Sequence, residues 1–265
     1  MYSTFKSTQK YLHYWFTANN GKGHGTHSPF VYDFIRNILI NKKTCPAHKQ
    51  ITQLCKQLKK DHRIVDIEGF CERATIPISQ KVKMADLYRS MVKPAKYDQL
   101  FFRMARHYKS QYVLEIGGSL GITTSYLALA NANTTIITYE ESDAIAKIAA
   151  QNFASLSIKN TLQILGNANN TLKDTLNKIN QLDFVFVNGN NCKETILFYW
   201  NMLYNKAHNE TLFIFDKIHG SAEMEEVWKK IQQLDAVSCT IDLFSIGIAS
   251  IRKEIKEPVH LSVRY

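Results

Sequence analysis

The residues best suited to chemistry lie in the segment 112–123, where an acidic residue ends an apolar run and a loop of small residues follows. The loop leads into a helix expected over 123–130. The candidate binding residues of this segment are Glu115, Gly117, Gly118, Ser119, Gly121 and Thr123. Strand, glycine turn and helix in this order present backbone N–H groups at the carboxyl end of a parallel strand, which is typical of a nucleotide-cofactor loop.

A second acidic residue strengthens this interpretation. Glu140 follows the apolar run 134–139 and stands 19 residues after Gly121. A carboxylate at the end of a second parallel strand is placed to accept hydrogen bonds from the two hydroxyls of a ribose. The two strand-end acids, Glu115 and Glu140, therefore predict an adenosine ligand. The alternative is that the glycines serve only the packing of a strand against a helix.

The elements that must position these residues form an alternating pattern after about Gln111. Seven apolar runs predict strands at 112–116, 134–139, 161–165, 182–187, 210–215, 236–241 and 246–252. Helical patterns between the first six indicate a Rossmann-like α/β fold with helices on both faces of the sheet. Only Asp242 to Ser245 separate the last two runs, and this connection is too short for a parallel crossover. Strands six and seven are therefore expected to pair as an antiparallel hairpin at the edge of the sheet.

Residues 1–110 have a different character, and we expect an N-terminal helical layer there, followed by a main domain over 111–265. Ser28 and Pro29 mark a helix start, and the helix is expected to run to about Ile40. Further helices are predicted near 46–60, 79–92 and 95–109. Residues 1–110 hold 20 Lys and Arg against 7 Asp and Glu, and residues 111–265 hold 13 against 16. The basic part suits an anionic partner or is a solvated helical surface.

Composition limits the class of protein. The 265 residues, 45% of them hydrophobic, are enough to bury a full core. No apolar stretch approaches the roughly 20 residues that span a bilayer, and no secretory signal is seen, so a cytoplasmic protein without membrane contact is expected. The five cysteines have no C-x-x-C spacing, which indicates reduced thiols without a zinc site.

Several separate stretches resemble the class I S-adenosylmethionine (SAM) dependent methyltransferases, and among them the catechol O-methyltransferase-like group. The stretches are the loop 114–123, residues 216–221 after the fifth strand, and an N-terminal HGTHSPF motif at 24–30, which resembles an uncharacterised bacterial family. The resemblance implies SAM as the cofactor. It places Glu115, Gly117 and Ser119 along the methionine part, Thr123 at its carboxylate, Glu140 on the ribose, and Asn167 and Ala168 beside the adenine.

The catalytic end departs from that group. Its members hold a divalent cation with two Asp residues and a neighbouring Asp or Asn, where this chain has Asn188, Asp216 and Lys217. An ammonium group there would repel a hard cation, so no metal is expected. One carboxylate and one ammonium also sum to zero charge, and Lys217 is therefore a candidate for holding an acceptor oxyanion in place of the metal.

Three histidines have weaker claims. His219 is the titratable group nearest the expected methyl path and is a candidate general base, although a histidine at a helix start also serves as a structural group. His24 and His27 have a metal-like spacing without a third partner, and we expect them to shape the edge of a cleft.

These observations predict a SAM-dependent methyltransferase acting on an oxygen of a small or medium-sized acceptor without a metal. Two alternatives stay open. The basic residues 1–110 favour an RNA methyltransferase, with nucleic acid as the partner, and the altered residues Asn188, Asn191 and Lys217 favour a catalytically inactive relative that binds a partner. Neither the acceptor nor the oligomeric state follows from the sequence.

Overall fold

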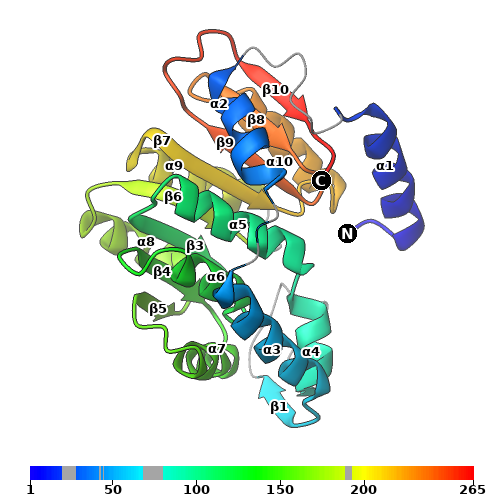
Figure 1. The fold of residues 1–265 in the computed structure, drawn as a ribbon, viewed down its shortest axis with the longest axis vertical. Coiled ribbons are helices and arrows are strands. Elements are labelled where there is room, and N and C mark those ends of the chain that lie inside the picture. Colours follow the sequence, from blue (N-terminus) through cyan, green and yellow to red (C-terminus); the bar gives the residue numbers. More distant parts are fainter. Residues whose placement is uncertain (20–27, 42, 44, 68–79, 189–192) are drawn as a thin grey trace. The chain divides into compact units, whose positions relative to one another are not determined.

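The structure is a computed structural model that describes residues 1–19, 28–41, 43, 45–67, 80–188 and 193–265 (Figure 1). The chain divides into two compact units. Unit 1 comprises Met1–Lys42, Ile179–Val187 and Asn191–Tyr265, and unit 2 comprises Lys43–Lys178 and Asn188–Asn190. The domain boundary expected after residue 110 stays a prediction.

Unit 2 contains three parallel strands in the order β3-β4-β5. They are β3 (Tyr112–Ile116), β4 (Thr135–Glu140) and β5 (Thr161–Leu165). Each strand is followed by a helix, namely α6 (Ile122–Ala130), α7 (Asp143–Ser155) and α8 (Ala168–Asn177). The register pairs Ile116 with Tyr139, so β3 and β4 end together and bring the two predicted acidic residues to the same end of the strands.

The remaining helices of unit 2 precede the strands. They are α3 (Pro46–Lys60), α4 (Met84–Met91) and α5 (Ala95–His107), of which α3 packs on α4 and α6, and α5 packs on α6 (Figure 1). A Pro at the first turn and Lys59 and Lys60 in the last turn favour α3 at both ends. The predicted helix near 79–92 was wrong at its start, because Gln80–Lys83 is strand β2 and pairs antiparallel with β1 (Ile64–Ile67).

Unit 1 contains five strands in the order β10-β8-β9-β7-β6. They are β6 (Leu182–Val187), β7 (Ala207–Asp216), β8 (Cys239–Asp242), β9 (Ile246–Ser250) and β10 (Val259–Ser262). Strand β9 is antiparallel to both β7 and β8, which confirms the predicted hairpin. The prediction omitted β10, which runs parallel to β8 and extends this side of the strand order beyond it.

Helices surround these strands within unit 1. They are α1 (Thr4–Thr17), α2 (Pro29–Asp33), the π-helical turn η1 (Phe34–Leu39), α9 (Lys193–Tyr204) and α10 (Ala222–Gln232). The predicted helix from Pro29 to about Ile40 is confirmed as α2 and η1 together, and Ser28 accepts the N-cap hydrogen bond. Among the helices of the described residues, none combines the length and the apolar character that crossing a bilayer requires.

Candidate functional site

The loop between β3 and α6 has a backbone that requires glycine. Gly117 and Gly121 have φ angles of 100° and 74°, a region that side chains rarely adopt. The N–H groups of Gly117 and Gly118 both donate to the Tyr139 carbonyl, at 3.0 and 2.8 Å, and tie the loop to the end of β4. Asn152 donates its side-chain amide to the Leu120 carbonyl at 2.8 Å. We call residues 117–121 the cofactor loop.

Glu115 ties together the residues that flank this loop through hydrogen bonds with Thr124 and Thr138. Its side chain is fully buried, and its Oε2 atom accepts hydrogen bonds from the hydroxyls of Thr138, at 2.8 Å, and Thr124. A Cβ atom at Gly118 would lie only 2.4 Å from the Thr138 hydroxyl oxygen. The absence of a side chain at Gly118 therefore leaves room for Thr138, whose hydroxyl donates to Glu115.

Glu140 is the anionic centre of the site. Its carboxylate is 2% exposed and accepts three backbone hydrogen bonds, from Ser119 at 2.7 Å, Glu141 at 3.0 Å and Ser142 at 3.1 Å. Ser119 has a φ angle of 53°, and its hydroxyl is buried without a hydrogen-bond partner among the described residues. A buried polar group without a partner carries a free-energy cost, which a bound ligand would remove.

The other predicted cofactor residues lie around the same strand ends of unit 2. Thr123 is buried and donates its hydroxyl to the buried carboxylate of Asp98 at 2.7 Å, a contact between α6 and α5 that the sequence did not reveal. After β5, the Gly166 N–H donates to the Glu140 carbonyl at 2.9 Å. Asn167 is exposed and caps α8, and Ala168 is buried.

A Cβ atom at Gly166 would meet no atom within 4 Å. The φ angle of Gly166 is 118°, so glycine is favoured there by the backbone and not by crowding. The space beside Gly166 is open and lies close to the Glu140 carbonyl. Glu140 is the residue predicted to bind a ribose, and a ligand that extended from it toward β5 would need such a space.

Asn188 also belongs to unit 2, although it follows β6. Its backbone N–H donates to the Ile116 carbonyl and its side-chain amide to the Gly117 carbonyl, both at 2.8 Å. By its resemblance, the sequence places Asn188 at an altered metal-ligand position. In the structure it holds the first glycine of the cofactor loop, a task that requires an N–H donor and that a carboxylate cannot perform.

Asp216 and Lys217 lie in unit 1, at the end of β7. Asp216 is 5% exposed. Lys217 has a φ angle of 53°, and its backbone N–H donates to the Ser245 carbonyl at 2.6 Å. This left-handed conformation is unfavourable for lysine and is better tolerated by Asn or Asp, the residues of the resembling group at this position. The backbone of Lys217 therefore has a conformation that its side chain does not favour.

His219 is held between two carboxylates. Its Nε2 atom lies 2.7 Å from Asp242 and its Nδ1 atom 3.1 Å from Glu225, and its ring stacks on Phe244. Burial lowers the pKa of His219, but the hydrogen bonds and charges of Asp242 and Glu225 outweigh burial and raise the pKa above its ordinary value. With both ring nitrogens facing carboxylates, the geometry favours an imidazolium and leaves no lone pair for a general base.

The Glu225 carboxylate also anchors α1. It accepts hydrogen bonds from Lys10 at 2.7 Å and from the Tyr2 hydroxyl at 2.9 Å. Burial raises the pKa of Glu225, but the hydrogen bonds of Lys10, Tyr2 and His219 outweigh burial and lower it. The sequence missed this network because its members come from three separate segments.

Some predicted residues lie outside the described part of the chain. They are Asn191 and residues 24–27, which are the first four residues of the N-terminal motif and include His24 and His27. Among the described residues, no group of three His, Cys, Asp or Glu side chains is arranged to hold a metal ion. The three cysteines of the described residues, Cys45, Cys55 and Cys239, are free thiols.

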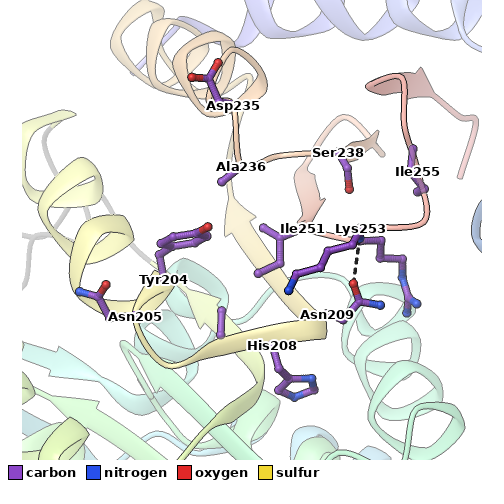
Figure 2. A pocket seen from close by; sticks show the side chains of 12 residues that line it. Tyr204, Asn205, His208, Asn209, Asp235, Ala236, Ser238, Ile251, Lys253 and Ile255 are labelled. Atoms are coloured by element: carbon purple, nitrogen blue, oxygen red, sulfur yellow. Dashed lines mark hydrogen bonds between the residues drawn. The ribbon is translucent and has the colours of Figure 1, made fainter.

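A cavity of 710 Å³ opens in unit 1 beside the start of β7 (Figure 2). Its walls combine polar and apolar side chains, and the Lys253 backbone N–H donates to the Asn209 side-chain oxygen at 2.8 Å. The His208 ring lies 2.8 Å from Asp183. No predicted site residue lines it. The cavity lies at the amino end of β7, whereas Asp216 and Lys217 lie at and after the carboxyl end.

Comparison with known proteins shows the fold. Neither a protein-family model nor a curated protein matches the chain. An O-methyltransferase from Bacillus cereus in complex with SAH is 17% identical, with a TM-score of 0.56 over 83% of this chain and 96% of its own. The SAM-bound O-methyltransferase TomG from Streptomyces achromogenes is 19% identical, with a TM-score of 0.56 over 79% and 91%. A SAH-bound methyltransferase from Podospora anserina is 11% identical, with a TM-score of 0.58 over 96% and 98%.

The chain therefore has the Rossmann-like α/β fold of these methyltransferases. This confirms the predicted fold class. The narrower resemblance, to a bacterial family with the HGTHSPF motif, stays a prediction.

Proposed function

We propose that this protein is a SAM-dependent methyltransferase that methylates an oxygen of a small or medium-sized acceptor without a divalent metal. The observation that carries the proposal is the Glu140 carboxylate, which organises the cofactor loop through the Ser119 N–H and lies at the end of β4. A second-strand carboxylate beside a glycine loop is the recognition element for a ribose in this class of fold.

The residues of unit 2 fit an adenosine-containing cofactor by three criteria. Ser119 offers a buried hydroxyl that lacks a partner among the described residues. Glu140 offers a carboxylate, and the backbone at Gly166 leaves open space. We assign Asn167, which is exposed at the start of α8, and the buried Ala168 to the border of the adenine. The bound cofactor would supply an electrophilic methyl group on a sulfonium centre.

The residues of the chain would then hold the cofactor and the acceptor and orient them for methyl transfer. In-line positioning supplies most of what methyl transfer needs. Asn188 fixes the Gly117 carbonyl and so the loop. We assign Lys217 the role of holding the acceptor oxyanion. The carboxylate of the preceding residue, Asp216, would balance the charge of the ammonium. His219 is better suited to fixing the segment after β7 than to removing a proton, because both ring nitrogens face carboxylates.

Metal independence is supported by the donor set. Only Asp216 of the three expected ligand positions supplies a carboxylate, and the amide of Asn188 points its N–H at a carbonyl. A hard cation needs oxygen ligands, and the ammonium of Lys217, next to Asp216 in the sequence, would repel it.

Calorimetric titration with SAM and with SAH, first in EDTA and then in excess magnesium, tests the proposal. Saturable binding that is equal in both buffers is expected. Failure of both ligands to bind would overturn the proposed function, and binding or transfer that appears only with magnesium would overturn the metal-independent mechanism. For Lys217, Lys217→Met should abolish methyl transfer to any acceptor that the wild type methylates while SAM binding persists, and Lys253→Met is the matched control.

A further inference from the structure

A cavity of 420 Å³ opens in unit 2 among α3, α4, α5 and α6. Its volume falls within the range of small-molecule sites, about 300–1,000 Å³. None of its lining residues was predicted to bind a cofactor or an acceptor. It differs from the cavity of unit 1 in that basic side chains dominate the charge of its walls and buried aromatic side chains lie among its lining residues.

Four basic side chains line the cavity. They are Lys56 and Lys59 on α3, Arg89 on α4 and Lys93 in the turn before α5. Lys56 and Lys59 stand three residues apart on one face of α3, and neither has an ion pair among the described residues. Arg89 pairs with the exposed Asp86. The single carboxylate of the lining is Asp98, which is buried and accepts the hydroxyl of Thr123. The cavity therefore has a positive potential that its own acid does not cancel.

The floor of the cavity is aromatic and apolar. Tyr126 and Tyr88 are buried, and Ile122 lies beside them at the start of α6. Burial raises the pKa of Tyr126 to about 12 and also raises the pKa of Tyr88, so both hydroxyls keep their protons at neutral pH. The Lys59 ammonium lies 5.5 Å from the centroid of the Tyr88 ring. A ligand here would meet flat apolar surface below and cations at the rim.

We propose that this cavity binds a small organic anion with an aromatic body, whose carboxylate, sulfonate or phosphate lies against Lys56, Lys59 and Arg89. Charge-assisted hydrogen bonds to the anion and contact of its ring with Tyr126 would divide the recognition between the two ends of the ligand. The lining shares no residue with the predicted cofactor site, and the proposal does not rest on the proposed function.

Fluorescence titration with 8-anilinonaphthalene-1-sulfonate, an aromatic anion, tests the proposal on the full chain. Saturable binding of one probe per chain is expected. The double variant Lys56→Gln with Lys59→Gln should weaken binding at least about tenfold, because it removes two charged partners of the sulfonate. The control, Lys49→Gln with Lys60→Gln, removes the same charge from the same helix outside the cavity and should change affinity less than about twofold.

Two further measurements make the result specific. Uncharged N-phenyl-1-naphthylamine should bind both double variants alike, and Ala95→Trp, at the exposed first position of α5, should block the probe by filling the cavity. Equal losses in the two double variants, or no loss in either, would overturn the proposal. A parallel loss of SAM affinity in the Lys56 and Lys59 variant would assign the cavity to the cofactor and would also overturn it. Probe binding without any SAM binding would leave this site standing and reject the proposed function.

Discussion

The cofactor loop and the segment after β7 each follow the end of a strand. Each is also bonded to a buried acidic residue, Glu140 for the loop and Asp242 for the segment, but the two carboxylates have different partners. In the loop, the carboxylate of Glu140 accepts backbone N–H groups, and the Ser119 hydroxyl is left for a ligand. After β7, His219 is shared between the side chains of Asp242 and Glu225. We propose the first arrangement as a ligand site, whereas the second joins side chains of the protein to one another.

This contrast has a physical origin. A loop built from positive φ angles and carboxylate-to-backbone hydrogen bonds tolerates few substitutions, because side chains cannot replace the backbone contacts. Ion pairs between partly exposed side chains contribute little to stability one by one, so their loss is better tolerated. The comparison predicts that changes in the loop will cost both stability and cofactor binding, and that changes after β7 will act on stability alone, with the exception of Lys217.

Gly121→Ala should have the largest effect. A Cβ atom at this residue would lie 2.5 Å from the Phe153 ring, and the φ angle of 74° adds strain. Overpacking and left-handed strain together predict a loss of about 2–4 kcal/mol in the free energy of unfolding, measured by urea denaturation, and loss of SAM binding.

The matched control is Gly166→Ala, which has positive φ but open space around the new methyl group. It should cost only the backbone strain, about 1–2 kcal/mol. Equal losses in the two variants would show that Phe153 does not crowd the loop.

His219→Asn should cost about 2 kcal/mol near pH 6, because charge-assisted hydrogen bonds to Asp242 and Glu225 are lost. The folded pKa of His219 lies above its ordinary value of about 6.5. Its contribution is therefore complete below the unfolded pKa and is lost as pH rises through the folded pKa. Urea unfolding of the wild type and the variant at several pH values should show their difference shrink as the pH rises.

His260→Asn provides the opposite slope. Burial lowers the pKa of His260, so the wild type loses stability relative to this variant as pH falls through the unfolded pKa. A pH-independent difference for His219→Asn would contradict the imidazolium between two carboxylates.

Asn188→Asp should cost about 1–2 kcal/mol at pH 7, because a carboxylate oxygen would then face the Gly117 carbonyl in place of an N–H donor. Protonation of the new carboxyl supplies a donor again, so part of the loss should return at low pH. Asn205→Asp, in which an exposed amide bonds the Asn201 carbonyl, is the control and should cost less than about 0.5 kcal/mol. An Asn188→Asp variant as stable as the wild type would remove Asn188 from the account of the loop.

Lys217→Asn should have the smallest effect and the opposite sign. Asn tolerates the left-handed conformation better than Lys, so the variant should gain about 0.5–1 kcal/mol of unfolding free energy. Lys217→Ala keeps the strain and should gain nothing. If Lys217→Ala is stabilised equally, the lysine side chain and not its backbone is the source of the cost.

Sequence periodicity predicted the strands and helices with strong local signals. The seven predicted strands are present, and α3 and α5 begin at Pro46 and Ala95, as expected. The four-residue strands β1, β2 and β10 were missed because their apolar patterns are too short, and their pairing partners decide their conformation.

The candidate site was predictable to the extent that it depends on glycines and strand-end acids. Glu115 and Glu140 were selected because each lies at the end of an apolar run, and the register of β3 and β4 brings these two ends together. The partners of His219 lie 6 and 23 residues away, and the amide of Asn188 reaches a carbonyl 71 residues away. Such contacts depend on the tertiary fold, and no local spacing reveals them.

Calorimetric titration of SAM into the wild type, Glu140→Gln and Glu141→Gln tests the central claim most directly. Glu140 is buried against the cofactor loop, whereas its neighbour Glu141 is exposed. The account predicts saturable binding to the wild type, at least about tenfold weaker binding to Glu140→Gln, equivalent to about 1.4 kcal/mol, and a change of less than about twofold for Glu141→Gln. Absence of SAM binding to the wild type, or unchanged affinity in Glu140→Gln, would contradict it.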